Sequence, residues 1–197
     1  IRIVVDRLLA EYDQRRLLAT GELEGSAKFQ ERLDERGTHE MLFASRTVLC
    51  EGRDDVFALR SFLTDHARDL DLDGQSVSIT RAGDVQQVAA FAAMASRLGI
   101  PWLALVDEDL QDDGTVKPQT AAAVAKIEAL QQAEGSGELV RWPGNLERCL
   151  GLTAGKADPA RVARCLEDKS RANLQSELPD YVGACDKVAA WLRLPLA

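Results

Sequence analysis

Residues 48–55 have the sequence VLCEGRDD, and residues 103–109 have the sequence LALVDED. In each stretch, an apolar run typical of a buried parallel strand ends abruptly in carboxylates. Ligands of open α/β sheets collect beyond the carboxyl ends of neighbouring parallel strands, so we expect these acids to converge on one place. Carboxylates that share a small volume raise each other's pKa unless a cation lies between them. A hard, oxygen-binding cation such as Mg²⁺ is the simplest counter-ion for such a group.

The sequence around these two stretches alternates between strand and helix patterns. Strands are predicted at residues 47–50, 76–80, 102–106 and 138–142. Helices are predicted at residues 55–70, 84–98 and 118–132. Alternation at this spacing predicts an α/β fold in which parallel β-α-β units form a doubly wound, Rossmann-like sheet flanked by helices.

Additional helical segments are predicted at both ends of the chain. Apolar residues recur at helical spacing in the first forty residues, and we expect the second helical piece there to end at Gly37. After Pro143, a short turn at 145–150 precedes helices at 159–168 and 182–192. We therefore divide the chain into a helical lead-in at 1–40, a core at 41–142 and a helical C-terminal segment at 143–197.

The composition is that of an ordinary soluble globular protein, with 197 residues of which 46% are hydrophobic and 28% charged. There is no apolar run long enough to span a membrane, and the first residues, IRIVVD, include neither an initiator Met nor a signal-peptide pattern. We therefore expect a cytoplasmic piece of a longer protein, without membrane association. The net charge of −8 argues against coating nucleic acid by bulk attraction, but it does not exclude a nuclease whose acids bind metal.

Four cysteines are scattered along the chain without a CxxC pair, and only two histidines accompany them. A zinc site is therefore not expected, and we predict buried free thiols. The four residues are Cys50, Cys149, Cys165 and Cys185.

The first acidic motif contains two candidate ligands. Glu51 stands at a strand end, followed by Gly52, where the absence of a Cβ atom permits close approach. Asp55 lies four residues beyond Glu51, and the start of a helix at this spacing brings its carboxylate back toward Glu51. The alternative is that Asp54 or Asp55 only caps the helix N-terminus.

The second motif and the C-terminal segment supply further candidates. In extended geometry, Asp107 and Asp109 leave the same face of the chain, although such pairs also occur in solvated turns. From residue type alone, Glu147 does not rise above an ordinary helix-surface acid, and Lys187 is expected to be a solvated cation. Other lysines that could serve in catalysis are Lys117, Lys156 and Lys169.

The two motifs together resemble those of a Toprim domain, the metal-binding module of primases, topoisomerases and certain nucleases. A glutamate-glycine strand end and a later Asp-x-Asp strand end are the two motifs of that module. Residues 40–46, 99–101 and 145–147 are additionally similar to the OLD (overcoming lysogenization defect) family nucleases. The likeness covers roughly residues 38–150 well and the two ends only loosely.

The resemblance implies a set of functional residues for this chain. The metal ligands would be Glu51, Asp55, Asp107, Asp109 and Glu147. The catalytic groups would be Glu51, Asp107 and a late lysine, which falls on Lys187. Two departures from the family pattern are the additional acids Asp54 and Glu108. The family's nuclease domain normally follows an ATPase domain, so the resemblance also implies an ATPase partner in the same full-length protein, with a possible homo-oligomer formed through that missing region.

The function that follows from the motifs and the resemblance is metal-dependent hydrolysis of DNA phosphodiester bonds, as an endonuclease or exonuclease. Two Mg²⁺ or Mn²⁺ ions would hold the scissile phosphate, activate a water and stabilise the departing 3′ oxygen. Strand transfer in the manner of a topoisomerase would require Tyr12 or Tyr181 as nucleophile. Phosphotransfer in the manner of a receiver domain would place a labile phosphate on Asp107 or Asp55. The non-enzymatic alternative is a Mg²⁺-binding regulatory or dimerisation module.

Overall fold

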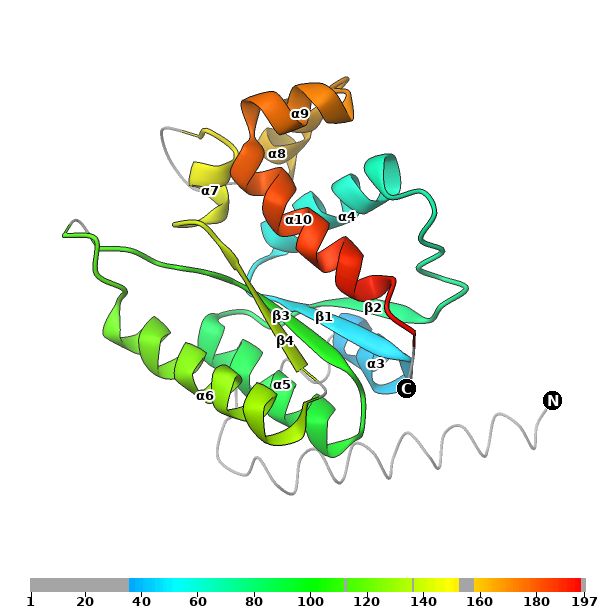
Figure 1. The fold of residues 1–197 in the computed structure, drawn as a ribbon, viewed down its shortest axis with the longest axis vertical. Coiled ribbons are helices and arrows are strands. Elements are labelled where there is room, and N and C mark those ends of the chain that lie inside the picture. Colours follow the sequence, from blue (N-terminus) through cyan, green and yellow to red (C-terminus); the bar gives the residue numbers. More distant parts are fainter. Residues whose placement is uncertain (1–35, 112, 136, 153–157, 196–197) are drawn as a thin grey trace.

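The computed structural model describes residues 36–111, 113–135, 137–152 and 158–195. Within them, four parallel strands form one sheet in the order β2-β1-β3-β4 (Figure 1). The strands are β1 (Arg46–Cys50), β2 (Val77–Arg81), β3 (Trp102–Asp107) and β4 (Gly137–Trp142). This arrangement confirms the predicted parallel α/β sheet. The helical pieces predicted within residues 1–35 lie outside the described residues.

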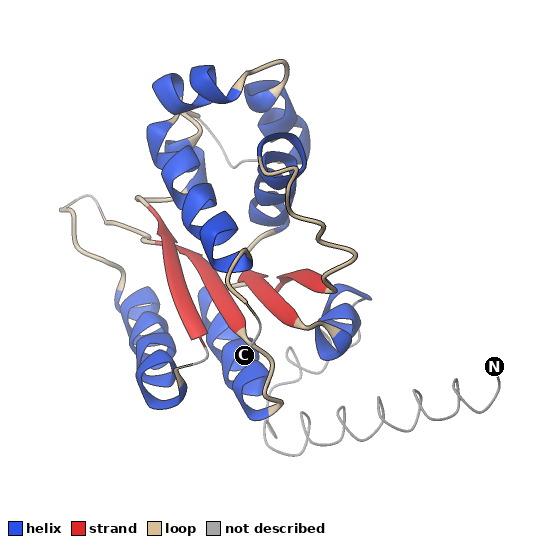
Figure 2. Ribbon diagram, turned by 45° about the vertical axis from the view of Figure 1, so that its right-hand side comes forward, coloured by secondary structure: helices blue, strands red, loops and turns tan. Residues whose placement is uncertain are grey.

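Helices cover both faces of the sheet (Figures 1 and 2). One face packs against α3 (Arg36–Phe43), α5 (Val85–Arg97) and α6 (Pro118–Glu134). The other face packs against α4 (Arg53–His66) and α10 (Pro179–Leu192). Because both faces are covered, all five residues of β1 are buried, and successive residues Val48 and Leu49 enter the two different cores.

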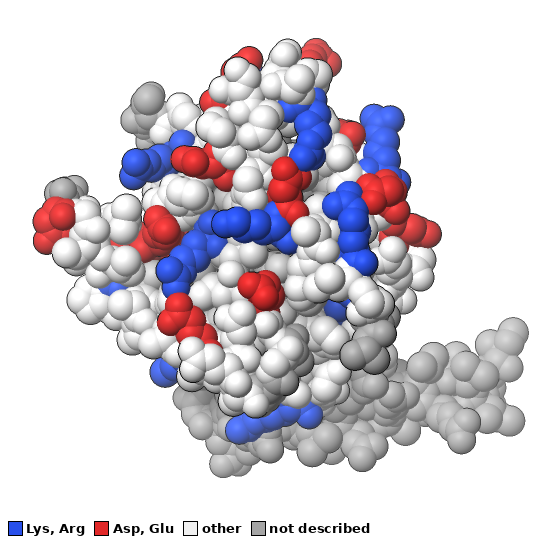
Figure 3. Space-filling model, viewed as in Figure 1, with Lys and Arg blue, Asp and Glu red and all other residues white. Residues whose placement is uncertain are grey.

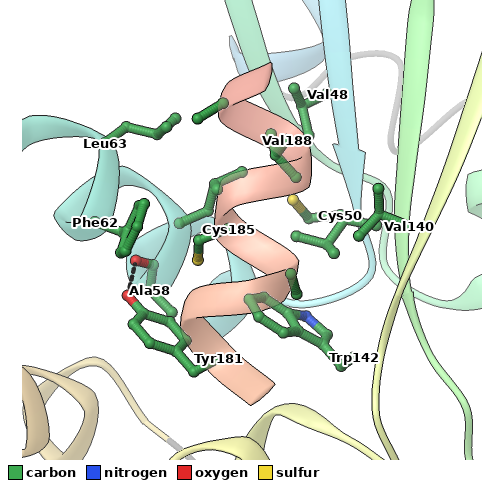
Figure 4. Packing of buried hydrophobic residues seen from close by; sticks show 14 of the residues in the cluster. Val48, Cys50, Ala58, Phe62, Leu63, Val140, Trp142, Tyr181, Cys185 and Val188 are labelled. Atoms are coloured by element: carbon green, nitrogen blue, oxygen red, sulfur yellow. Dashed lines mark hydrogen bonds between the residues drawn. The ribbon is translucent and has the colours of Figure 1, made fainter. Parts of the chain in front are cut away.

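The core between the sheet and α10 contains three of the four cysteines, and Figure 4 shows Cys50 of β1 and Cys185 of α10 within it. All four cysteines are free, and Cys50, Cys149 and Cys185 are buried, as predicted, whereas Cys165 is half-buried. Burial raises the pKa of the Cys50 and Cys185 thiols well above its usual value. These thiols therefore act as small apolar groups in the packing.

The connections create a switch point between β1 and β3. From β1 the chain returns through α4 on one face to β2, and from β2 it crosses through α5 on the opposite face to β3. The two loops that leave the carboxyl ends of β1 and β3 therefore diverge, although these strands are direct neighbours. Such a point is where open α/β sheets form ligand crevices.

The C-terminal segment contains four helices among the described residues. They are α7 (Leu146–Cys149), α8 (Pro159–Leu166), α9 (Arg171–Glu177) and α10. The buried Arg46 of β1 joins this segment to the sheet, because its guanidinium donates to the carbonyls of Trp191, Leu192 and Leu194 at the end of α10. No helix in the described ranges is both long and apolar enough to cross a membrane.

Several helix predictions were wrong, among them the end of α4, which lies at His66 and not at the predicted residue 70. Gly37 does not end a helix but lies inside α3, whose Met41 and Leu42 are fully buried, so core packing outweighs the low helix propensity of glycine. Helix α9 was not expected, since its seven residues include only one buried side chain, Leu174. Helix α10 begins at Pro179, three residues earlier than predicted, because proline is well suited to the first helical position.

Candidate functional site

Glu51 and Asp107 lie side by side at the carboxyl ends of β1 and β3. The backbone N–H of Asp107 donates to Oε1 of Glu51, with an N···O distance of 2.9 Å. Burial raises the pKa of Glu51 to about 7, and the charge of Asp55 acts in the same direction. Burial, followed by the charges of Asp55 and Glu51, raises the pKa of Asp107 to about 8. The structure therefore brings the two predicted motifs into direct contact.

Asp55, in the first turn of α4, is 7% exposed and has both carboxylate oxygens engaged. Oδ2 accepts a hydrogen bond of 2.6 Å from the backbone N–H of Gly52, and Oδ1 accepts one of 2.9 Å from the indole N–H of Trp142. Burial raises the pKa of Asp55 to about 6, although both donors stabilise the ionised form. Asp55 thus caps its helix, as the alternative interpretation held, and also belongs to the acidic group around Glu51.

Asp109 does not continue the extended geometry expected for an Asp-x-Asp motif. Strand β3 ends at Asp107, and Asp109 adopts a left-handed backbone conformation with φ of 51°. Its Oδ1 accepts from Nζ of Lys117 at 2.9 Å, and its Oδ2 accepts from the hydroxyl of Thr120 at 2.9 Å. The predicted common face of Asp107 and Asp109 is therefore wrong, although the charge of Asp109 still contributes to the raised pKa of Glu51.

Glu147 lies in the first turn of α7, which follows β4 directly. Its charge helps to raise the pKa of both Asp55 and Asp107. The start of α7 also holds Asp107 directly, since the backbone N–H of Leu146 donates to Asp107 Oδ1 at 3.2 Å. All five acids predicted as metal ligands are thus within electrostatic range of at least one other member.

The candidate lysines are placed differently from one another. Lys187 is exposed on α10, and no hydrogen bond or ion pair among the described residues joins it to the five acids. Lys169 pairs with Glu177, and Lys156 lies outside the described residues. Lys117 is the candidate that contacts an acid of the site. A catalytic role for Lys187 stays a prediction.

Sequence reasoning missed three side chains that shape the site: Trp142, Thr120 and Lys117 as the partner of Asp109. The signal for Trp142 was its place at the end of β4, which puts its indole at the same sheet edge as the acids. Lys117 and Thr120 belong to the start of α6, where the chain returns to that edge after the loop that follows β3. Their pairing with Asp109 depends on the path of this loop, which no local pattern encodes.

The donor set suits a divalent cation in its chemistry, because it consists of buried and half-buried carboxylates that raise each other's pKa. No hydrogen bond among the described residues engages Oε2 of Glu51 or Oδ2 of Asp107, so one oxygen of each remains for a ligand. Across the described ranges, however, no three His, Cys, Asp or Glu side chains are arranged to hold a metal ion together. Side chains such as Asp109, now paired with Lys117, would have to turn to join a shared ion.

Comparison with known families agrees with the two motifs. Residues 42–109 match the family model described as the Overcoming lysogenization defect protein-like, TOPRIM domain. This segment is an OLD-like TOPRIM domain. It includes Glu51, Asp55, Asp107 and Asp109, whereas Glu147 and Lys187 lie beyond it.

Two solved structures show a distant likeness to the chain. The C-terminal region of the Burkholderia pseudomallei OLD protein is 14% identical over 77% of this chain and 98% of its own, with a TM-score of 0.47. The C-terminal region of the Xanthomonas campestris pv. campestris OLD protein is 19% identical over 78% of each chain, with a TM-score of 0.40. No curated protein matches the sequence.

Proposed function

We propose that this chain is the nuclease part of a longer ATPase-nuclease protein and that it hydrolyses DNA phosphodiester bonds with the help of Mg²⁺ or Mn²⁺. The observation that carries the proposal is the meeting of Glu51, Asp55 and Asp107 at the switch point of an OLD-like TOPRIM sheet. Divalent cations bound there would supply charge stabilisation for the phosphate and the leaving oxygen and would activate a water; two ions suit this chemistry best.

The residues of the chain would contribute orientation and proton transfer. Glu51 has a pKa of about 7, so near neutral pH it can both accept and release a proton at Oε2. The N–H of Asp107 fixes Oε1 of Glu51, and the N–H of Leu146 fixes Oδ1 of Asp107, so both carboxylates are oriented before a ligand arrives. Asp55 is held most firmly, with donors on both oxygens, and would act mainly through its charge.

The test is nicking of supercoiled plasmid with Mg²⁺ or Mn²⁺, with and without a chelator. Asp107→Asn retains an oxygen that can accept from Leu146 but removes the charge, so we expect cleavage to fall by at least about a hundredfold while the fold is kept. Asp65→Asn is the matched control, because Asp65 is exposed at the other end of the helix that carries Asp55. Equal cleavage by the wild type and Asp107→Asn would refute the site.

The same assay separates the alternative functions. A regulatory or dimerisation module would leave the plasmid intact with either cation, whether or not its acids bind Mg²⁺. A topoisomerase would need an accessible tyrosine, but Tyr181 is fully buried, and its hydroxyl donates to the carbonyl of Ala58 at 2.8 Å (Figure 4). Tyr12 lies outside the described residues.

A further inference from the structure

Two arginines lie at the same sheet edge as the acids, one at the end of β2 and one at the start of α4. Arg81 is the last residue of β2 and pairs in register with Cys50, immediately before Glu51. Arg53 is the first residue of α4, two positions after Glu51. Both side chains are exposed, and both positive charges reach Asp54, where they oppose the burial and the charges of Asp158 and Glu147 that raise the pKa of that residue.

A lysine lies on the side of β3 and α6. Nζ of Lys117 is 2.9 Å from Oδ1 of Asp109, and the side chain is 55% exposed. The charges of Asp107 and Glu51 also help to raise the pKa of Lys117, which places its ammonium within their electrostatic range. An ammonium carries three N–H groups, so Lys117 can bind a phosphate oxygen while it still contacts Asp109.

The face shown in Figure 3 also carries Lys and Arg side chains, some of them next to one another. There, Lys and Arg side chains are interspersed with Asp and Glu over α10 and β4. Arg141, for example, is paired with Glu128, and Arg193 with Asp69. With a net charge of −8, the chain cannot attract a polyanion through its overall field, so local cations must do so.

We propose that Arg81 at the end of β2, Arg53 at the start of α4 and Lys117 at the start of α6 hold the phosphate backbone of a DNA strand across Glu51 and Asp107. The inference rests on the proposed nuclease function and specifies how its substrate lies: the strand crosses the ends of β2, β1 and β3 in that order. Arginine suits the outer position, because its planar guanidinium can bind a phosphate through two N–H groups. The acids between these cations face the phosphate that is to be cleaved.

The test is the binding of a fluorescently labelled DNA oligonucleotide, measured by anisotropy over a series of KCl concentrations. Ca²⁺ replaces Mg²⁺, since it uses the same oxygen ligands, and a gel verifies that the DNA stays intact. The variants are Arg53→Gln, Arg81→Gln and Lys117→Gln. Each removed phosphate contact should weaken binding about three- to tenfold near 0.1 M salt and reduce the slope of log K against log salt by about one.

Two controls make the result specific. Arg68→Gln removes an exposed arginine just beyond the far end of α4 and should leave binding and slope unchanged. Arg53→Lys keeps the charge and should restore most of the affinity that Arg53→Gln loses. Thermal melting verifies that each variant is folded.

The possible outcomes distinguish the inference from the function beneath it. If the wild type nicks plasmid but folded Gln variants bind DNA with unchanged affinity and slope, the backbone path is refuted and the nuclease proposal stands. If the wild type neither binds nor cleaves DNA with any divalent cation, the function fails, and the path fails with it. Equal weakening by Arg68→Gln would also refute the path, because it would show a diffuse charge effect.

Discussion

Raising the pH of the metal-free protein from about 5 to about 8 is expected to destabilise it. Asp107 has a folded pKa of about 8, whereas its usual value is 3.8. Below pH 4 the carboxyl is protonated in both the folded and the unfolded chain. Between pH 4 and 8 the folded chain retains a proton that the unfolded chain has released, so the free energy of unfolding falls as pH rises. Glu51 and Asp55 act in the same direction, with pKa values of about 7 and 6.

The size of the effect follows from the difference between the folded and unfolded pKa values. A tenfold change in an ionisation equilibrium is worth about 1.4 kcal/mol, so Asp107 alone sets an upper bound of about 6 kcal/mol. Asp107 is half-buried and keeps contact with water and salt, which screen part of its charge. The three carboxylates also act partly through each other's charges, so their effects overlap rather than add. We expect an observed loss of about 2–3 kcal/mol between pH 5 and pH 8.

The measurement is urea denaturation at pH 5, 6, 7 and 8 in the presence of EDTA. Asp107→Asn should lose less than half as much stability over this range, and at pH 8 it should be more stable than the wild type. Addition of Mg²⁺ to the wild type at pH 8 should recover the loss, because a bound cation neutralises the carboxylates. A wild-type stability that rises steadily with pH, or an unchanged slope in Asp107→Asn, would show that the acids do not share a half-buried site.

Three further predictions concern contacts around the site and the sheet. Arg46→Ala should lower the free energy of unfolding by about 3 kcal/mol, because it removes the charged donor to three carbonyls at the end of α10; a urea-measured loss below 1 kcal/mol would contradict this. Trp142→Phe should lower the free energy of unfolding by about 1–3 kcal/mol in the same measurement, since Asp55 loses its indole donor. Tyr181→Phe removes one neutral hydrogen bond and should lower it by only about 1 kcal/mol. Lys117→Gln should bind Mn²⁺ up to about fivefold more tightly by calorimetry, because a surface ion pair worth at most about 1 kcal/mol no longer competes for Asp109; weaker binding would contradict it.

The sheet and the meeting of its acidic motifs were predictable from the sequence. Apolar runs that end in Glu51 and Asp107 were enough to predict adjacent parallel strands, because β-α-β units place every carboxyl end at one edge. The backbone hydrogen bond between these two residues follows from that adjacency. The predicted strands lie within one residue of the observed ones, since their boundaries coincide with sharp changes from apolar to charged residues.

The orientation of individual acids was not predictable, because it depends on contacts distant in sequence. Asp109 takes a left-handed conformation, in which its N–H donates to the carbonyl of Gly144 and its carbonyl accepts from the N–H of Lys117. These are tertiary contacts of a loop, and no local periodicity specifies them. For Lys187, the family resemblance implied a catalytic role. On α10, however, its side chain is exposed, and no contact among the described residues joins it to the acids.

The segment after β4 completes the acidic site even though it lies beyond the matched TOPRIM region. Trp142 donates to Asp55, the N–H of Gly144 donates to Glu108 at 2.9 Å, and the N–H of Leu146 donates to Asp107. A fragment that ended near residue 110 would retain four of the five predicted metal ligands but would lose a hydrogen-bond donor to each of Asp55, Glu108 and Asp107. Half-buried carboxylates without donors become harder to ionise and less well oriented. Donors at residues 142, 144 and 146 therefore orient acids that belong to the matched TOPRIM segment.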